Sequence, residues 1–531
     1  MQMTFAAGFL LLIWVVASIL VNGIALLHYL TKLRGLELLG YGAAAGVLLH
    51  ALFGCAIAAA PTVRWAFVAM LIALTLLSAA YFFVRQVLQE FSLALSKPSK
   101  VSLALWVLLL VLSLGLLHVD VQFPESLADG LYIFKTHTTN VKVQYLTGLP
   151  ADNYIPFTVA EFFLRGVSFK KERPILPGNE VSNRTILMSL VALPFRVALG
   201  APRDHPRLGT YTYLGREWPD VSRLNTRGYF EQFAVVGLVL NSLMLLGLLV
   251  FCSSLGATSV LPLATLLYVT NQYFIAQTVY TWPKAMTGFF ILLAWASMRR
   301  GHSPVVVAAL MALAFHSHPY AIVFAGCAGL FYLTQWRREK SRVPSAVLYL
   351  LVFGLMLAPW IIWTRSVLHI PSDLIAQNFA GPGTEAAWTS LTNFVWIRLY
   401  NLFCLASPMM FSVYPFDFRA VVNYWIFCLP GVVGLVMIYP ALAQCANLPR
   451  PRPWLWYGLL GPASLILALY SCPALPVLHG YQPLLGVLLF FSVWWLSQRC
   501  TRTVCIGLVG LQLLFNLGLL LARGLITGAR F

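Results

Sequence analysis

Long apolar runs recur along the whole chain. Residues 5–27 and 230–253 are each long enough to cross a hydrocarbon core of about 30 Å as an α-helix. In lipid each segment must satisfy its own backbone N–H and C=O groups, which favours helices, and no stretch shows the alternation of barrel strands. The pattern predicts about fourteen spans, near residues 5–27, 38–60, 65–84, 101–119, 230–253, 257–279, 283–298, 303–316, 319–335, 344–365, 421–443, 454–472, 478–497 and 502–523. We therefore expect an all-α polytopic membrane protein.

Composition agrees with this pattern and argues against soluble domains. The 531 residues are 60% hydrophobic and 10% charged, with a mean hydropathy of +0.80, which leaves too little polar surface for a water-soluble globule. The N-terminus lacks a basic region and a small-residue cleavage site, so the first apolar run is expected to be a retained span. The nine cysteines are scattered and show neither paired metal spacing nor a disulfide framework.

The net charge of +18 is explained by topology, and we expect no nucleic-acid partner. Alternate short connections carry the cations, and the positive-inside rule places these connections in the cytoplasm and both termini outside. The cations concerned are Lys32, Arg34, Arg85, Lys97, Lys100, Arg299, Arg300, Arg337, Arg338, Lys340, Arg342, Arg450, Arg452, Arg499 and Arg502. In this arrangement His316-Ser317-His318-Pro319 is a tight outer turn between two short helices.

Two long segments outside the cytoplasm divide the chain into five regions: residues 1–119, 120–229, 230–365, 366–420 and 421–531. The 120–229 loop holds ten of the seventeen carboxylates, as a long polar loop requires for solubility. It also holds apolar stretches at 154–163 and 184–199, which we expect to dock on the membrane face of the bundle. The middle of the second segment, 386–403, is expected to be an amphipathic surface helix, with a re-entrant segment as the alternative.

Within the first loop, Asp129-Gly130 follows the fourth span and precedes a helix-like stretch that contains His137. Asp129 therefore falls near a helix N-terminus, where the dipole favours an ionised carboxylate. One interpretation is simple N-capping. The other is a base that takes a proton from an incoming hydroxyl group, with Asp152 as the second candidate.

At these residues the sequence resembles bacterial members of the GT-C superfamily, the polytopic glycosyltransferases that include lipid A aminoarabinose transferase and protein O-mannosyltransferases. The resemblance covers the architecture of most of the chain and four short motifs. These are Ala128-Asp129-Gly130 followed by Leu149-Pro150 and Asn153, Asn183-Arg184-Thr185, Tyr280-Thr281-Trp282-Pro283-Lys284, and His479-Gly480-Tyr481. The sequence departs from the family in three extra N-terminal spans and in lacking the adjacent acidic pair of many members.

The resemblance implies transfer of a sugar from a polyprenyl-phosphate carrier to a hydroxyl group of a glycan, lipid or protein, outside the cytoplasm. It also implies a bacterial inner membrane with the active face in the periplasm, and Asp129 at the position of the catalytic acid. The missing acidic pair favours a lone base over a divalent metal, so we expect no cofactor. Attack opposite a departing phosphate inverts the anomeric centre.

The leaving phosphate needs cationic or hydrogen-bonding groups. Lys284, at the outer end of a span, is the first candidate, with a lysine that reaches out to water as the equal alternative. Arg184 is the second, because a guanidinium suits phosphate oxygens. The histidine candidates for substrate binding are His137, His316, His318 and His479.

Three other functions stay open. A lipid-linked saccharide transporter or flippase would need charged or broken helices at mid-membrane, whereas the predicted span centres hold few ionisable groups. An O-antigen ligase or polymerase also has a large external loop but uses Arg and His more than a lone Asp. A structural subunit without chemistry is the third.

Overall fold

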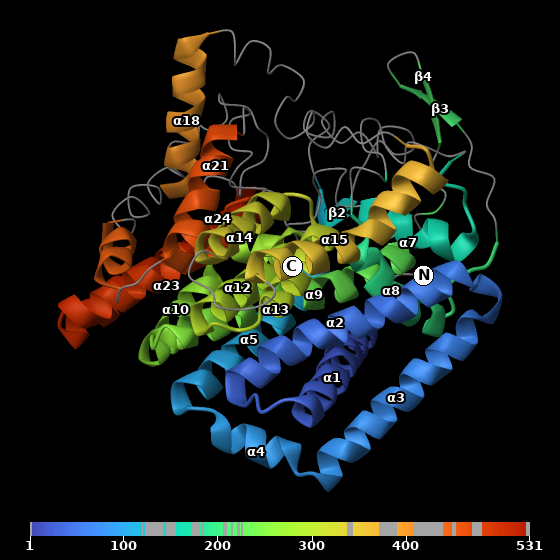
Figure 1. Ribbon diagram of the computed structural model, residues 1–531, viewed down its shortest axis with the longest axis horizontal. Helices are drawn as coiled ribbons and strands as arrows, with labels where there is room; N and C mark the ends of the chain where they lie inside the picture. The colour runs from blue at the N-terminus through green and yellow to red at the C-terminus, as the bar shows by residue number, and fades with distance from the viewer. Residues whose placement is uncertain are drawn as a thin grey trace.

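The computed structural model of the chain (Figure 1) consists mainly of helices. It describes residues 3–118, 120–122, 142–144, 155–170, 181, 185–204, 210–213, 216–219, 224, 227–336, 344–370, 390–406, 439–448, 453–469 and 480–526. Long apolar sequences form these helices because the i→i−4 ladder satisfies the backbone without water. The predicted helical architecture is thus confirmed, apart from two short strand pairs among the described residues.

Residues 3–118 form α1 (Phe5–Leu30), α2 (Gly35–Ala59), α3 (Arg64–Val84), α4 (Val87–Ala94) and α5 (Lys97–Leu117). The side chain of Ser96 accepts a hydrogen bond from the Ser99 amide and so caps α5. α1 and α2 approach closely through glycine. A Cβ atom at Gly46 would overlap the Ile19 carbonyl group, and one at Gly23 would overlap that of Gly42, so small residues permit this backbone contact.

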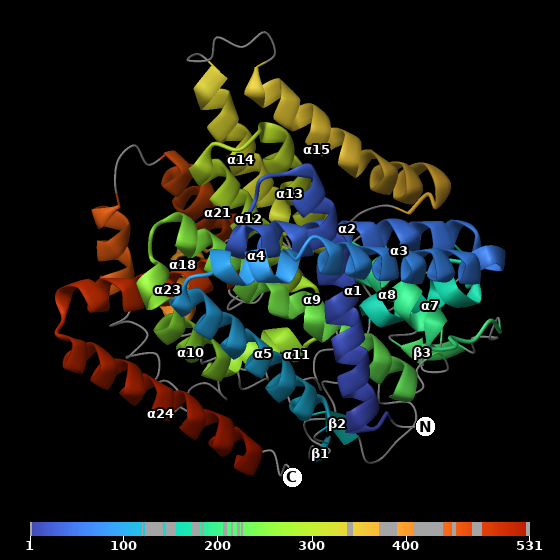
Figure 2. The ribbon, with the colours of Figure 1, turned by 90° about the horizontal axis from the view of Figure 1, so that it is seen from below.

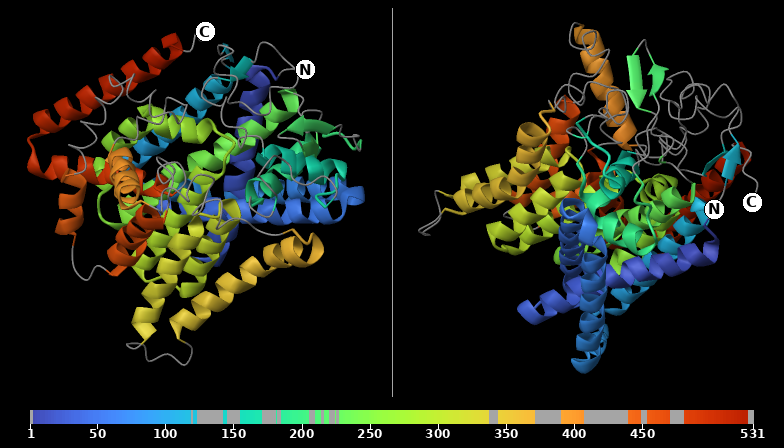
Figure 3. Two further views of the ribbon diagram at one scale, coloured as in Figure 1. Left: turned by 90° about the horizontal axis from the view of Figure 1, so that it is seen from above. Right: turned by 90° about the vertical axis from the view of Figure 1, so that its right-hand side faces the viewer.

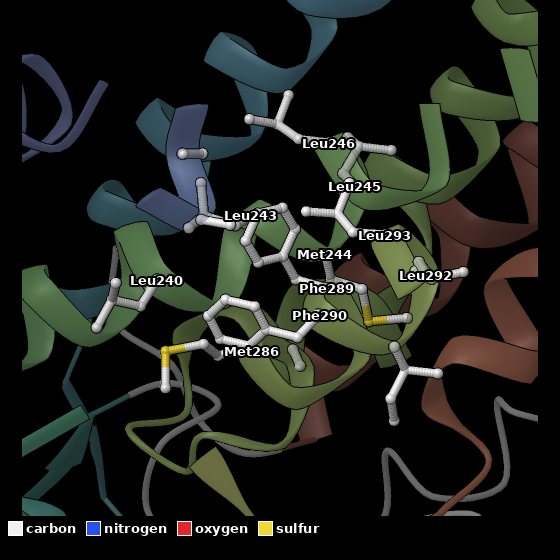
Figure 4. Close-up of a cluster of buried hydrophobic side chains, with 14 of the residues drawn as sticks. Leu240, Leu243, Met244, Leu245, Leu246, Met286, Phe289, Phe290, Leu292 and Leu293 are labelled. Carbon is white, nitrogen blue, oxygen red and sulfur yellow. The ribbon is translucent and has the colours of Figure 1, made fainter. Parts of the chain in front are cut away.

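The centre of the bundle is α9 (Arg227–Ser254), whose most apolar window is entirely buried inside the protein. α12 (Lys284–Arg300) packs along it. Figure 4 shows this contact, with Met244 of α9 beside Phe289 and Phe290 of α12. These side chains form the middle of a hydrophobic core that extends through α1, α2, α5 and α10.

The predicted span at 257–279 is not one helix. After a 3-10 turn (Thr258–Val260), α10 (Leu261–Thr270) ends at Asn271, and the shorter α11 (Gln272–Val279) follows. Four residues, 280–283, then lead into α12. Asn271 and Gln272 are the polar residues that mark this break in the sequence. They follow the apolar run 257–270, and hydropathy averaged over the whole predicted span dilutes their contribution.

After α12 come α13 (Pro304–Ser317), α14 (Ala321–Trp336) and α15 (Ser345–Ile362), which continues as a π-helical turn (Trp363–Val367). A tight turn between two short helices is present as predicted, but it spans residues 318–320, and His316 and Ser317 of the predicted turn are the last residues of α13.

The C-terminal part contains α18 (Leu391–Ala406), a π-helical turn (Leu455–Leu460) leading into α21 (Gly461–Leu469), α23 (Gln482–Arg499) and α24 (Arg502–Ile526). α18 confirms a helix in the predicted 386–403 stretch. Figure 2 shows α24 running along the outer edge of the molecule, where it contacts α10.

Between α5 and α9 the described residues form α7 (Ile155–Arg165), α8 (Leu187–Ala198) and two short antiparallel ladders. Strand β1 (Asp120–Gln122) pairs with β2 (Lys142–Gln144), and β3 (Thr210–Tyr213) pairs with β4 (Arg216–Pro219). As expected for the apolar stretches of this region, α8 packs against α2, α3 and α9. Figures 1 and 3 show β3, β4 and α18 at one end of the molecule and α4 at the opposite end.

Among the described residues, six helices are long and apolar enough to cross a bilayer. They are Phe5–Leu30, Gly35–Ala59, Pro61–Val84, Lys97–Leu117, Gly228–Ser254 and Ser345–Val367. Further apolar helices in the described ranges are shorter, α13 and α14 among them. Most of the predicted span at 421–443 lies outside the described residues. The apolar helices thus agree with a membrane protein, and the predicted count of fourteen spans stays a prediction.

Candidate functional site

The helical backbone hydrogen bonding is interrupted between α10 and α11, and polar side chains bond to backbone groups at this break. The Asn271 Oδ1 atom accepts a hydrogen bond from the Tyr273 amide at 2.9 Å and caps α11. From α24, the Asn516 side chain donates to the Leu267 carbonyl group at 3.4 Å and to Thr270 Oγ1 at 3.3 Å. Backbone groups that lose their helical hydrogen bonds inside an apolar bundle need other partners. The side chains of Asn271 and Asn516 therefore stabilise the break.

The turn between α11 and α12 is held by Asn241 of α9, which is fully buried. Its side-chain amide donates to the carbonyl groups of Tyr280 and Trp282, the latter at 3.2 Å, and its Oδ1 accepts from the Met286 amide at 3.2 Å. One side chain therefore fixes both the turn and the first turn of α12.

Asn241 also sets the depth at which α12 begins. It lies near the midpoint of the 28-residue α9, about 20 Å from either end at 1.5 Å per residue. The N-terminus of α12 is therefore deep inside the bundle. The sequence placed Lys284 at the outer end of a span. The structure instead places it beside the middle of the central helix.

Lys284 is the first residue of α12 and is fully buried. Its Nζ atom lies over the ring of Trp282, an arrangement in which the ring face stabilises a cation. The helix N-terminus carries about half a positive charge, so two positive sources coincide at this point. Of the two interpretations of Lys284, the extended lysine that reaches water does not fit this burial.

His318 belongs to the same cluster, which we call the α12 site: Asn241, Trp282, Lys284, His318 and Tyr320. The rings of Trp282 and His318 are 6.5 Å apart, and the Tyr320 hydroxyl group donates to the Lys284 carbonyl group at 2.9 Å. His318 Nδ1 accepts from the Tyr320 amide at 3.3 Å. A neutral His318 therefore carries its proton on Nε2, which makes Nε2 a hydrogen-bond donor.

His316 and His318, two residues apart, contact different helices. His316 Nε2 bonds to the Met356 carbonyl group of α15 at 2.9 Å, whereas His318 belongs to the α12 site. Within the described ranges, no group of three or more His, Cys, Asp or Glu side chains is placed to hold a metal ion.

A second buried polar cluster joins α7, α8 and α9. Glu161 is fully buried between two arginines, at 2.9 Å from Arg165 Nε and 2.6 Å from Arg196 Nη2. Arg196 also donates to Gln232 and lies over the Tyr229 ring, 4.6 Å from its centroid. As one of ten acids in the long loop, Glu161 was expected to do no more than make the loop soluble. In the structure it is the carboxylate of an ionic core.

Arg64 of α3 completes the attachment of the two loop helices. Its guanidinium donates to the Leu164 carbonyl group of α7 at 3.3 Å and to the Ala201 carbonyl group, just after α8, at 2.8 Å. A cation at two helix C-termini is favourable because their dipoles are negative there. The arginine therefore ties α7 and α8 to the membrane bundle.

The remaining sequence candidates lie outside the described residues: Asp129, His137, Asp152, Arg184 and His479. The residues directly after His479 are described. Gln482 Nε2, at the start of α23, donates to Gln277 Oε1 of α11 at 2.6 Å. The structure therefore brings the start of α23 to α11, seven residues before Lys284.

Sequence reasoning missed Asn241, Glu161 and Arg196. Asn241 carried a signal, because an amide in the middle of the apolar run 230–253 is costly in lipid unless it has partners. Glu161 and Arg165 stand four residues apart, the spacing of a helical ion pair. The contact of Arg196 with Glu161 joins residues 35 apart, and no local pattern reveals it.

No family model, curated protein or solved structure matches this chain.

Proposed function

We propose that the chain is a membrane glycosyltransferase of the GT-C type, moving a sugar from a polyprenyl-phosphate carrier to a hydroxyl group of a glycan, lipid or protein acceptor on the extracytoplasmic face. The observation that carries the proposal is the α12 site. A buried ammonium group, a helix N-terminus and His318 lie together deep in an apolar bundle.

This arrangement suits the leaving group of the reaction. The donor joins an anionic phosphate to a long apolar chain, so its site needs positive charge in an apolar setting. Helix N-termini favour phosphate, and an ammonium group adds a charge-assisted hydrogen bond. Low polarity around Lys284 strengthens both contributions relative to water.

Asp129 is the proposed base, with Asp152 second. The carboxylate takes the proton of the acceptor hydroxyl group, and the acceptor oxygen forms a bond to the anomeric carbon. The bond from that carbon to the phosphate oxygen breaks, and the phosphate keeps the electron pair. Attack opposite the leaving group inverts the anomeric centre. Arg184, His137, His316 and His479 are proposed to bind donor or acceptor.

The test is turnover of the full-length protein in nanodiscs with a panel of polyprenyl-phosphate monosaccharides and a panel of glycan, lipid and protein acceptors that carry hydroxyl groups, measured as release of polyprenyl phosphate. We expect Asp129→Asn to abolish turnover and Lys284→Ala to lower it about 100-fold, the loss of one charge-assisted contact of about 3 kcal/mol. Lys170→Ala, at an exposed lysine, is the control and should be active. Unchanged turnover of both site variants would refute the proposal, and loss with Lys284→Ala alone would favour a ligase.

A transporter of lipid-linked saccharides is the second candidate, and the helix break at Asn271 favours it. Transporters place discontinuous helices around a substrate site near the bilayer midplane, and α10 and α11 are separated at Asn271. The two candidates separate in proteoliposomes. A transporter moves the intact donor across the bilayer without acceptor and without releasing polyprenyl phosphate, and a transferase releases it only when acceptor is present.

A further inference from the structure

The short helix α4 crosses one end of the bundle, opposite β3, β4 and α18 (Figures 1 and 3). The chain leaves α3 through Gln86, whose φ of 51° lies in the left-handed region, and so turns sharply into α4. Val87 is fully buried and Glu90 bonds to His28 of α1 at 3.3 Å. α4 is thus held against α1 and α2 as a defined element.

The chain around α4 exposes large apolar side chains. Phe83 and Val84, at the end of α3, are 88% and 75% exposed, and Leu88 and Leu93 of α4 are 66% and 79% exposed. Such exposure is costly in water. In an eight-residue helix that lies across the end of spanning helices, it is typical of an interfacial helix whose apolar side enters the edge of the acyl layer.

Cations surround these apolar side chains. Exposed basic residues flank α4 in sequence and in the neighbouring α1–α2 connection: Lys32, Arg34, Arg85, Lys97 and Lys100. From residue 28 to residue 100 the sequence has two carboxylates, Glu37 and Glu90, and each has a partner, Arg300 and His28 respectively. This end of the molecule therefore carries an excess of positive charge.

The positions of Lys97 and Lys100 give a second indication of an anionic neighbour. Both lie in the first turn of α5, where the helix dipole is also positive and where acidic residues would stabilise the helix. In water these two lysines therefore destabilise α5 electrostatically. An anion bound from outside the protein would make their electrostatic contribution to the stability of α5 favourable.

We infer that α4, its flanking Phe83 and Val84, and the five exposed cations form a binding surface for anionic phospholipids, which we call the α4 surface. Headgroup phosphates contact the lysines and arginines while Leu88 and Leu93 enter the acyl boundary. Attraction of juxtamembrane cations to anionic lipid grows with each basic residue and falls with salt. The inference is independent of the transferase proposal, because α4 lies at one end of the molecule and the α12 site lies beside the middle of α9.

The test is hydrogen–deuterium exchange of the full-length protein in nanodiscs of phosphatidylcholine, with and without phosphatidylglycerol. We expect amides 85–96 to exchange at least about ten-fold more slowly with the anionic lipid. The triple variant Arg85→Gln, Lys97→Gln, Lys100→Gln should lose this difference, and high salt should remove it from the unaltered protein.

The matched control carries Lys170→Gln, Arg203→Gln and Arg365→Gln, three exposed cations away from α4. It loses the same charge and should keep the lipid-dependent slowing. Unchanged exchange of α9 shows that each variant is folded. Equal exchange of residues 85–96 in the two lipids, or loss of the difference in the control, would overturn the inference. Slowing that requires a co-purifying protein would do so as well, because it would assign the surface to a protein partner.

Discussion

At the scale of single residues, a few buried polar side chains determine the interior of this membrane protein. Asn241 fixes the turn before α12 through three hydrogen bonds, and Glu161 neutralises charge between two arginines. Buried polar groups stabilise a structure only when their partners are present. Removing one partner therefore destabilises the protein by more than the energy of one hydrogen bond, because the remaining buried group loses its partner.

Asn241→Leu tests the support of the α12 site. The variant removes the side-chain amide that donates to the carbonyl groups of Tyr280 and Trp282 and accepts from the Met286 amide, and loss of a buried hydrogen-bond partner costs about 1–3 kcal/mol. We expect thermal unfolding in detergent at a clearly lower temperature, together with weaker binding of polyprenyl phosphate. Asn447→Leu, at an exposed asparagine, is the control. Stability and binding equal to those of the unaltered protein would contradict the role of Asn241.

Glu161→Gln tests the ionic core. It leaves Arg165 and Arg196 buried together without the shared carboxylate, and breaking a buried pair from one side costs about 3–5 kcal/mol. The control is Asp204→Asn, which removes the other acid near Arg165, at 3.6 Å but 64% exposed. An exposed ion pair contributes at most about 1 kcal/mol. Equal melting temperatures for the two variants would show that burial of Glu161 has no such effect.

At the scale of elements, the apolar runs predicted helices well and their interruptions poorly. Helices α1, α2, α3, α5, α9 and α15 lie within a few residues of the predicted spans. The prediction of one span at 257–279 failed because a mean over twenty residues hides the local cap at Asn271. Asn516, which donates to Thr270 beside the break, lies 246 residues further along the chain. The docking of α8 was predictable from its apolar stretch, and the ion pairs that hold α7 beside it were not.

Gly46→Ala tests the contact between α1 and α2. The added methyl group would overlap the Ile19 carbonyl group, which is backbone and cannot move aside. Overpacking of this kind costs about 1–3 kcal/mol. Gly115→Ala in α5 is the control, because a Cβ there meets nothing within 4 Å and alanine favours helix. Thermal unfolding should therefore separate the two variants in opposite directions. A Gly46→Ala protein as stable as the control would contradict this packing.

At the scale of the whole molecule, three separate regions have the structural and functional roles that we propose. α7 and α8 form a docked layer fixed by Arg64 and Glu161, and the α12 site lies beside the middle of α9. The α4 surface occupies the end of the molecule opposite β3, β4 and α18. The sequence identified Lys284 and His318 separately, from their residue types and positions. Both side chains lie beside the ring of Trp282. This arrangement depends on the turn between α11 and α12, whose tertiary contacts no pattern along the chain specifies.

The most direct test of the α12 site is equilibrium binding of polyprenyl phosphate to the full-length protein in nanodiscs, measured for the unaltered chain and for Lys284→Met. Methionine retains most of the apolar stem of lysine and removes the charge, so the bundle should remain folded. We predict binding at least about ten-fold weaker, or 1.4 kcal/mol, with no change for Lys170→Met. Equal affinity in Lys284→Met would contradict phosphate recognition at this site.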